Sequence, residues 1–259
     1  MSIILSSVEN QIGTITLNNP AKRNVLSGEL IEGITLAFKS FLEQNVRAVV
    51  IRALPGSKVW SAGHDVNELP NRGRDPLSWS DPLRVVVRAI QEFPAPVIAL
   101  IEGSVWGGAC EVTICCDIIV TAPDTTFAIT PAKLSIPYNL GGLLTLLNAI
   151  PQPVVREMLF TAQPIPASQA LNLGIINYIK PVEEIESFVY KMAAQIVENA
   201  PLSIAVMKEQ LRLLSSAHSI TPEVFEKVQG MRRIVYDSAD YQEGIDSFKQ
   251  KRKPVYRGE

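Results

Sequence analysis

Hydrophobic positions in the first half of the chain follow the spacing of β-strands. Residues 12–17 alternate between apolar and small or polar side chains, whereas residues 48–51 and 95–101 are short, almost continuous apolar runs. Alternation is typical of a half-buried strand, and a continuous run is typical of a strand buried on both faces. Because a helix-like segment follows each of these runs, the pattern predicts an α/β core.

The last third of the chain has helical spacing and few candidate strands. Apolar residues recur every three or four positions in residues 183–198, 202–214, 222–236 and 238–249. We therefore predict a core at 1–195 and a helical region at 196–259. Such helices carry apolar surface that they cannot bury alone, so we expect this region to pack on the core and on a neighbouring subunit. The Gly- and Pro-rich residues 70–82 are predicted to be a mobile loop within the core.

Composition narrows the possible partners. The 259 residues are 47% apolar, which is enough for one large core, and their 24 basic and 26 acidic residues are dispersed. Without a broad basic face, a nucleic-acid partner is not expected. The uncharged residues 134–155 are interrupted by Pro, Gly and Asn, so they are predicted to form buried loop and helix and not a membrane span.

Cysteine and histidine are too few and too irregularly placed for a metal centre. Cys110, Cys115 and Cys116 lack a CxxC spacing, and the two histidines are His64 and His218. We expect neither a disulfide framework nor a zinc site, and the cysteines are interpreted as packing residues. With no export signal at the N-terminus, the expected location is the cytoplasm.

Two glycine-containing segments carry the candidate chemistry. In VWSAGHDVNEL (residues 59–69), Asp65 is a candidate helix N-cap with Glu68 at capping-box spacing. In EGSVWGGACEVTICCD (residues 102–117), the pair Gly107 and Gly108 follows an apolar strand and opens a predicted helix. Glycine allows a ligand to approach the backbone closely, and a helix N-terminus favours a negative atom. A GxGxxG pattern does not occur, so a dinucleotide site is not favoured.

These two segments resemble the signature segments of the crotonase (enoyl-CoA hydratase/isomerase) superfamily. The resemblance extends over nearly the whole chain, from NNPAKRNVLS to YQEGIDSFKQKRKP. It implies an α/β spiral of ββα units with a C-terminal helical trimerisation region. It also implies an acyl-CoA substrate, no cofactor or metal, and a homotrimer or dimer of trimers.

The resemblance assigns a role to particular residues. The backbone N–H groups of His64 and Gly108 would form an oxyanion hole for the thioester carbonyl. The segments implied to contact the substrate contain Lys22, Arg23, Val25, Ala62, Gly63, His64, Asp65, Val66, Gly108 and Thr130. Lys251 is a candidate for binding the CoA phosphates, and its alternative is a solvated charge near the end of the sequence.

The side chains around the oxyanion hole determine which reaction of the superfamily the resemblance implies. Hydratases of the superfamily use two glutamates, and here Glu111 stands at the first position while the second falls on Thr130 or Pro131. Neither of those two can act as a carboxylate acid or base, so a hydratase is disfavoured. We interpret Glu111 as a structural ion-pairing or hydrogen-bonding residue. An enoyl-CoA hydratase, isomerase or thioesterase that uses Glu111 is the alternative enzyme.

Loss of CO2 from a malonyl-type thioester needs no base, because cleavage of the C–C bond itself supplies the electrons of the enolate. The stretches GRDPLSWSDPLR and TPAKLSIPYNLGG also resemble decarboxylating members of the superfamily, which implies conversion of methylmalonyl-CoA to propionyl-CoA. Tyr138 would then bind the substrate carboxylate, or it could be an ordinary turn tyrosine. For His64 we favour a role of the backbone alone over one of the imidazole. A non-catalytic protein that binds CoA esters or another protein is the remaining alternative.

Overall fold

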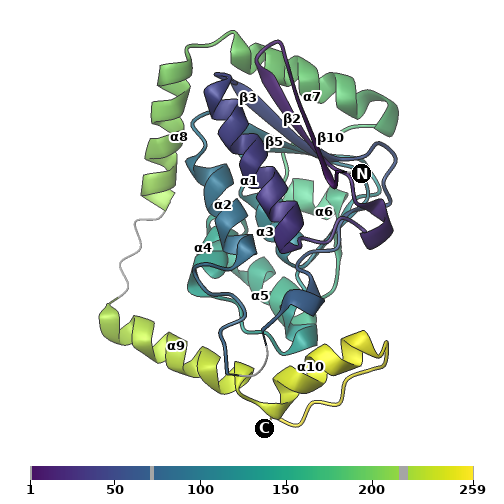
Figure 1. Cartoon of the computed structure of the whole chain (residues 1–259), viewed down its shortest axis with the longest axis vertical. Helices are drawn as coiled ribbons and strands as arrows, with labels where there is room; N and C mark the ends of the chain where they lie inside the picture. The colour runs from purple at the N-terminus through teal and green to yellow at the C-terminus, as the bar shows by residue number, and fades with distance from the viewer. Residues whose placement is uncertain (1, 71–72, 216–220, 259) are drawn as a thin grey trace.

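The computed structural model describes residues 2–70, 73–215 and 221–258, which form two β-sheets and ten α-helices (Figure 1). The larger sheet has the order β1-β2-β3-β5-β7-β10 and is parallel except for the β1–β2 hairpin. Its strands are β1 (Ile4–Glu9), β2 (Ile12–Leu17), β3 (Ala48–Ala53), β5 (Val97–Ile101), β7 (Ile118–Thr121) and β10 (Tyr178–Ile179). An α/β core with a mainly parallel sheet is therefore confirmed.

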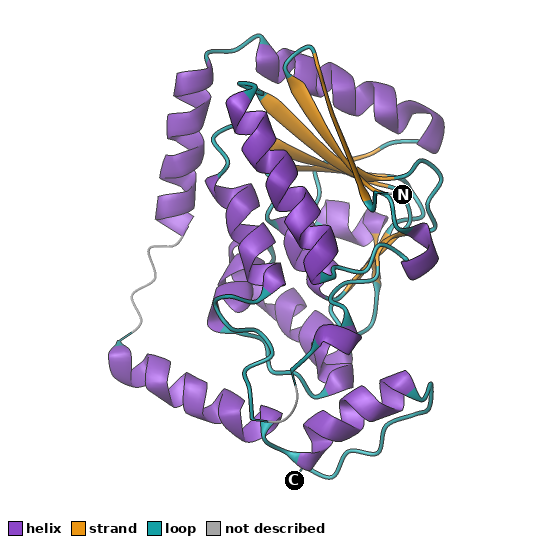
Figure 2. Ribbon diagram, viewed as in Figure 1, coloured by secondary structure: helices purple, strands orange, loops and turns teal. Residues whose placement is uncertain are grey.

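A smaller, four-stranded sheet lies below one end of the larger one in the view of Figure 2. Its strands, in the order in which they pair, are β4 (Val59–Ser61), β6 (Ser104–Trp106), β8 (Thr126–Ala128) and β9 (Ile165–Pro166). Strands of two or three residues are too short to produce a periodic pattern, so the sequence did not predict them. Strand β1 was also missed, because an edge strand with mostly exposed side chains has no apolar alternation.

Helices cover both faces of the larger sheet. On one face lie α1 (Gly28–Glu43), α2 (Pro82–Glu92) and α3 (Gly108–Ile114), and on the other lies α7 (Val182–Val197). Strand β3 divides its side chains between these layers, with Val49 and Ile51 facing the first and Val50 facing α7. Residues 48–51 are thus continuously apolar because both faces of β3 are buried, as the pattern predicts.

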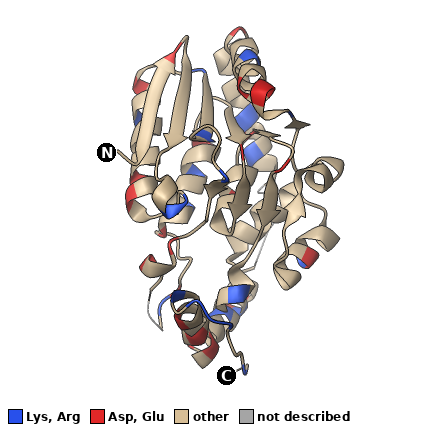
Figure 3. Cartoon of the chain, turned by 90° about the vertical axis from the view of Figure 1, so that its right-hand side faces the viewer, with Lys and Arg blue, Asp and Glu red and all other residues tan. Residues whose placement is uncertain are grey.

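The remaining helices are α4 (Leu140–Ala149), α5 (Gln152–Thr161), α6 (Ala167–Asn172), α8 (Pro201–Ser215), α9 (Pro222–Tyr236) and α10 (Ala239–Lys249). Of these, α8, α9 and α10 match the predicted periodic segments closely, whereas the pattern did not predict α4, α5 and α6 individually. Residues 134–155 are loop and helix, as predicted, but the expected burial was wrong for most of them, since only Asn139, Gly142, Leu146, Ile150 and Val155 are buried. None of the described helices is long and apolar enough to cross a bilayer. Acidic and basic side chains are interspersed over the chain (Figure 3).

The C-terminal helices differ in how they contact the rest of the chain (Figure 1). Helix α8 buries none of its residues, whereas Tyr236, Tyr241 and Ile245 of α9 and α10 pack against Val66 of the site. The predicted boundary at 195/196 falls within the last turn of α7, which ends at Val197. The division into core and helical region stays a prediction.

Residues 70–82, predicted to be a mobile loop, are bonded to other parts of the chain at several points. Residues 71 and 72 lie outside the described residues. The buried guanidinium of Arg232 in α9 forms an ion pair with Asp75, and the Tyr241 hydroxyl donates to the Pro70 carbonyl at 2.9 Å. Asn139 Nδ2 donates to the Leu77 carbonyl at 3.0 Å. These bonds connect the segment to the C-terminal helices and to α4.

The ion pair of Arg232 can be tested against its neighbour Arg233. Arg232→Met leaves the Asp75 carboxylate, 21% exposed, without its cation, so we expect a loss of roughly 2 to 3 kcal/mol in the free energy of unfolding. Arg233 is 72% exposed, and Arg233→Met should change stability by less than about 0.5 kcal/mol. Urea unfolding of both variants measures the difference. Equal midpoints would contradict the clamping role of Arg232.

Candidate active site

A cavity of about 430 Å³ opens where the two sheets meet the first turns of α2 and α3. The predicted site residues that line it are Lys22, Arg23, Val25, Ala62, His64, Asp65, Val66, Gly108, Thr130 and Tyr138. Of the other predicted residues, Gly63 and Glu111 lie behind the wall, while Lys251 is an exposed residue that does not line the cavity. The structure thus brings together residues that are up to 116 positions apart (138 − 22).

The segment that precedes His64 approaches Gly108 closely because Gly63 has no side chain. Gly63 has φ +82°, and a Cβ there would lie 2.4 Å from the Trp106 carbonyl oxygen and 3.1 Å from the Gly108 nitrogen. The Gly63 carbonyl in turn accepts from Leu26 N at 2.8 Å. In the described part of the chain, the N–H groups of His64 and Gly108 donate to no other protein atom. Both are therefore free for a ligand oxygen.

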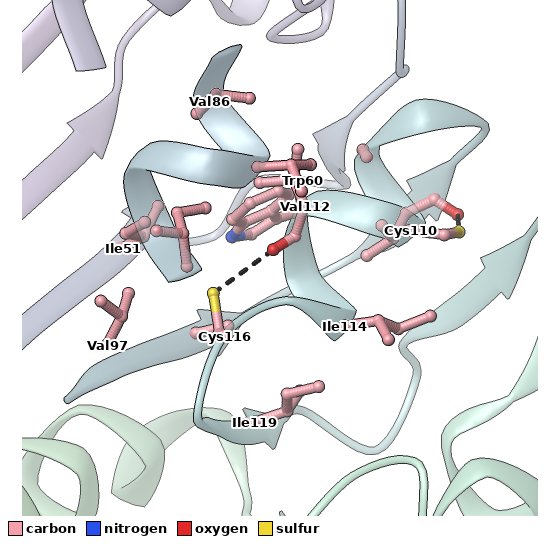
Figure 4. Packing of buried hydrophobic residues seen from close by; sticks show 14 of the residues in the cluster. Ile51, Trp60, Val86, Val97, Cys110, Val112, Ile114, Cys116 and Ile119 are labelled. Atoms are coloured by element: carbon pink, nitrogen blue, oxygen red, sulfur yellow. Dashed lines mark hydrogen bonds between the residues drawn. The ribbon is translucent and has the colours of Figure 1, made fainter. Parts of the chain in front are cut away.

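Helix α3 begins at Gly108, as predicted, after Gly107 in a conformation with φ +54°. All seven residues of α3 are buried, and its Val112 belongs to the same hydrophobic cluster as Trp60 and Cys116 (Figure 4). Burial raises the pKa of the Cys110 thiol to about 12 and that of Cys116 further. The thiols are neutral at ordinary pH, which agrees with the interpretation as packing residues.

Trp60 and Trp106 flank the hole differently. Trp60 is buried in the core, where its Nε1 donates to the Leu100 carbonyl at 3.0 Å. Trp106 is half-buried, and it faces a second cavity of about 630 Å³ that adjoins the first. Lys133, Arg252 and Tyr256 lie on the wall of this second cavity. Trp60 is therefore a core-packing residue, whereas Trp106 is only partly packed in the core and also borders the second cavity.

The predicted helix at Asp65 is only a single 3₁₀ turn, η2 (Val66–Glu68). Asp65 caps it by accepting from Asn67 N at 2.9 Å, as an N-cap does. Glu68 does not complete a capping box, because its carboxylate accepts from Gly28 N at 2.8 Å, at the start of α1. The expected helix at Asp65 was wrong in length, and Glu68 stabilises the N-terminus of a different helix.

The His64 side chain is held between two oxygen atoms. Its Nε2 lies 3.0 Å from Asp81 Oδ2, and its Nδ1 lies 3.1 Å from the Asp65 carbonyl. Burial disfavours a charge on the ring, but the hydrogen bond and the charge of Asp81 outweigh it, so the pKa of His64 is raised above 6.5. Asp81 itself caps α2 by accepting from Leu83 N at 2.9 Å.

Glu111 is fully buried and forms an ion pair with Arg84 of α2. Its second carboxylate oxygen accepts a hydrogen bond from the Tyr138 hydroxyl at 3.2 Å. Burial raises the pKa of Glu111 while Arg84 opposes this shift, and burial together with the Glu111 charge raises the pKa of Tyr138 well above 10. Glu111 thus has the ion-pairing role that we predicted.

Sequence reasoning missed the groups that α2 contributes. Asp81 and Arg84 each contact a predicted site residue, and Leu83 touches Gly108, where a Cβ would lie 2.8 Å from its Cδ2. The Asp-Pro pair at 81–82 is a recognisable helix start, which could have located α2 but not its partners. Apolar lining residues that were also missed are Leu69, Leu77, Leu83, Leu134, Ile136 and Phe248.

The chain is similar to known proteins over its whole length. The enoyl-CoA hydratase/isomerase family model matches residues 7–259. Methylmalonyl-CoA decarboxylase of Escherichia coli (strain K12) is 49% identical over 249 residues, which are 96% of this chain and 95% of that protein. The probable mitochondrial enoyl-CoA hydratase 2 of Arabidopsis thaliana is 29% identical over 98% of this chain and 84% of that protein.

Solved structures agree with the fold in detail. A methylmalonyl-CoA decarboxylase in complex with 2-nitronate-propionyl-CoA is 47% identical, with a TM-score of 0.98 over 99% of both chains. A methylmalonyl-CoA decarboxylase complexed with 2S-carboxypropyl CoA is also 47% identical, with a TM-score of 0.98 over 100% of this chain and 99% of that one. These matches confirm the predicted crotonase-like fold.

Substitution of Gly63 tests whether the close approach of this residue to Trp106 and Gly108 constrains the structure. In Gly63→Ala, the left-handed φ and the clash with the Trp106 carbonyl should act together. Gly174 is a matched control, since it also has a positive φ, +73°, but has nothing within 4 Å of an added Cβ. Gly174→Ala should cost about 1 to 2 kcal/mol from backbone strain alone, and Gly63→Ala roughly 1 to 3 kcal/mol more from overpacking. Thermal unfolding compares them, and equal losses would mean that the close approach imposes no constraint.

Proposed function

The chain belongs to the enoyl-CoA hydratase/isomerase family, and we propose that within it the protein decarboxylates methylmalonyl-CoA to propionyl-CoA and CO2. The observation that carries this proposal is the 49% identity to methylmalonyl-CoA decarboxylase over 96% of the chain. The complexes of similar structures with 2-nitronate-propionyl-CoA and 2S-carboxypropyl CoA support an acyl-CoA substrate. The chemistry of the cavity fits this reaction better than hydration.

The reaction moves one negative charge from the carboxylate to the thioester oxygen. The C–C bond breaks, its electron pair forms the enolate, and the carboxylate leaves as neutral CO2. A proton taken up from solvent then adds to C2 of the enolate and gives propionyl-CoA. The N–H groups of His64 and Gly108 would bind the oxygen where this charge develops. Each such donor typically contributes ~3 to 4 kcal/mol of transition-state stabilisation, because it is fixed in place before the reaction.

The walls of the cavity favour loss of the carboxylate charge. Leu77, Leu83 and Ile136 present apolar surface, which solvates a carboxylate poorly but accommodates CO2. Arg84, the cation nearest Glu111, is paired with that residue and does not line the cavity. The substrate carboxylate would therefore be less stabilised in the ground state than the enolate oxygen in the transition state.

Tyr138 is our candidate for orienting the carboxylate. Tyr138 lines the cavity, and its hydroxyl donates to Glu111, whose charge is offset by Arg84. We propose that the hydroxyl rotates toward the incoming carboxylate and holds the C–C bond perpendicular to the thioester plane, where it overlaps the carbonyl π system. Thr130, beside Gly107, would contact the substrate from the opposite strand end.

CoA would enter along the exposed Lys22 and Arg23, whose positive charges suit its phosphates. The Arg23 carbonyl accepts from Ala62 N at 2.9 Å, so these residues and the hole segment form one continuous edge. Val25 and residues 62–66 would then line the pantetheine. Lys251 remains a candidate phosphate ligand only, because its side chain is exposed and outside the cavity wall. We expect turnover without an added cofactor or metal.

We further propose that the protein is a cytoplasmic homotrimer or a dimer of trimers. Helix α8 exposes a row of apolar residues, with Leu202 81%, Leu211 68% and Leu214 73% exposed. Surface of this kind is normally covered in a stable protein. A second copy of the chain would cover it, in agreement with the expected packing of the C-terminal helices on a neighbouring subunit.

Two other functions remain as alternatives to the proposal. A hydratase, isomerase or thioesterase would need Glu111 as an acid or base, but Glu111 is buried, paired with Arg84 and outside the cavity wall. A non-catalytic binder of CoA esters would have no reason to keep two adjacent, unoccupied N–H groups at the bottom of the cavity. Both alternatives are distinguished from the proposal by direct assay.

The decisive assay measures CO2 release from methylmalonyl-CoA by the purified protein after dialysis against a chelator. We expect stoichiometric CO2 and propionyl-CoA, identified by mass. Crotonyl-CoA serves as the comparison substrate, because its hydration requires acid–base catalysis that decarboxylation does not. Hydration without CO2 release would replace the proposal by the hydratase alternative, and binding with no turnover would favour the binder.

Tyr138→Phe removes the hydroxyl and keeps the ring. We expect kcat for CO2 release to fall about 10- to 100-fold, the equivalent of one hydrogen bond to a charged group, or about 1.5 to 3 kcal/mol. Tyr190→Phe is the control, since the Tyr190 hydroxyl bonds Thr14 Oγ1 at 2.8 Å on the far side of the sheet. Steady-state kinetics of both variants gives the comparison. An unchanged kcat in Tyr138→Phe would remove the tyrosine from the mechanism.

A further inference from the structure

The imidazole of His64 faces an acceptor oxygen at each of its nitrogen atoms. Asp81 Oδ2 lies 3.0 Å from Nε2, and the Asp65 carbonyl lies 3.1 Å from Nδ1. A neutral imidazole has one N–H and one lone pair, so it can donate to only one of these oxygens. The imidazolium donates to both. The geometry therefore favours the doubly protonated ring.

The charged groups around the ring support the same protonation state. The carboxylates of Asp81, at the start of α2, and of Glu68, in η2, both raise the pKa of His64. The nearest cation on α2, Arg84, is paired with Glu111. The side chains of His64 and Asp81 are only 13% and 9% exposed, so solvent screens their interaction weakly.

We propose that Asp81 is a positioning residue of the reaction, which holds the His64 imidazolium and thereby fixes the His64 N–H in the oxyanion hole. This inference rests on the proposed decarboxylase function. It differs from a direct catalytic role of the ring, because both ring N–H groups are engaged by protein oxygens. The imidazole then acts on the backbone of its own residue and does not donate to the substrate.

Asp81 can hold the imidazolium in place because each of its two carboxylate oxygens accepts a hydrogen bond. One carboxylate oxygen caps α2 through Leu83 N at 2.9 Å, and the other accepts from His64. The Leu83 side chain packs against Gly108. The first turn of α2 thus contacts both halves of the hole, one through Asp81 and one through Leu83. Movement of this turn would change the distance between the two N–H groups.

The proposal gives the reaction a defined pH dependence. The pKa of His64 is raised on folding, so the two hydrogen bonds are complete at low pH and one is lost as pH rises through the folded pKa. Above that pKa, an unprotonated ring nitrogen faces an acceptor oxygen. We expect kcat/KM for CO2 release to fall on the basic side with the same midpoint as the titration of His64.

Asp81→Asn tests this pairing without removing the helix cap. Asparagine is as good an N-cap as aspartate, but it has no charge to stabilise the imidazolium. The basic limb of the pH profile should move to lower pH by about one unit, which corresponds to a roughly tenfold loss of kcat/KM above the midpoint. Asp81→Ser, which also keeps a capping oxygen, should show the same shift. Asp124→Asn, an exposed carboxylate between β7 and β8, is the matched control.

NMR titration measures the pKa of His64 without substrate. The chain has two histidines, so His218→Gln assigns the resonances. We expect a midpoint above 6.5 in the parent protein and a lower one in both Asp81 variants. An unchanged midpoint, or a pH profile that does not follow the shift, would overturn the positioning role. If the parent protein released no CO2 at any pH, the proposed function would fail, while the titration would still decide whether Asp81 holds the imidazolium.

Discussion

The close approach of the Gly63 backbone to Trp106 and Gly108 is the constraint on which the site depends. A segment that follows β4 must pass within van der Waals distance of the turn between β6 and α3, and only a residue without Cβ allows this. Parallel pairing of β4 with β6 brings the two segments to the same sheet edge. As a result, His64 and Gly108, which are 44 positions apart (108 − 64), line the same cavity.

Helix α2 connects this edge to the rest of the molecule. Its first turn carries three contacts to the site, through Asp81, Leu83 and Arg84. The segment before it is tied to α9 through the pair of Asp75 with Arg232. The C-terminal helices therefore influence the site although they contribute little to its wall. These contacts connect the wall of the cavity to the C-terminal helices.

The sequence predicted those parts of the molecule whose signals are local. Strand β2 and helices α7 to α10 follow from periodicity, and the turn at Gly107 follows from its glycines. The pairs of His64 with Asp81 and of Arg84 with Glu111 could not be predicted, because no periodicity relates residues 17 and 27 positions apart in different elements. The capping box predicted for Glu68 was wrong for a related reason. Its carboxylate bonds Gly28, which is distant in the sequence, and not a residue of its own turn.

The burial of Glu111 against Arg84 also bears on how the reaction repertoire of this scaffold could change. The chain has a carboxylate three residues after Gly108, and this Glu111 is buried and paired with an arginine on a different helix. Altering Arg84 would release this latent group without touching the oxyanion hole. The surroundings of Glu111 are thus set by the cation of α2 as well as by burial, and the two shift its pKa in opposite directions. A search for related activities should compare position 84 together with position 111.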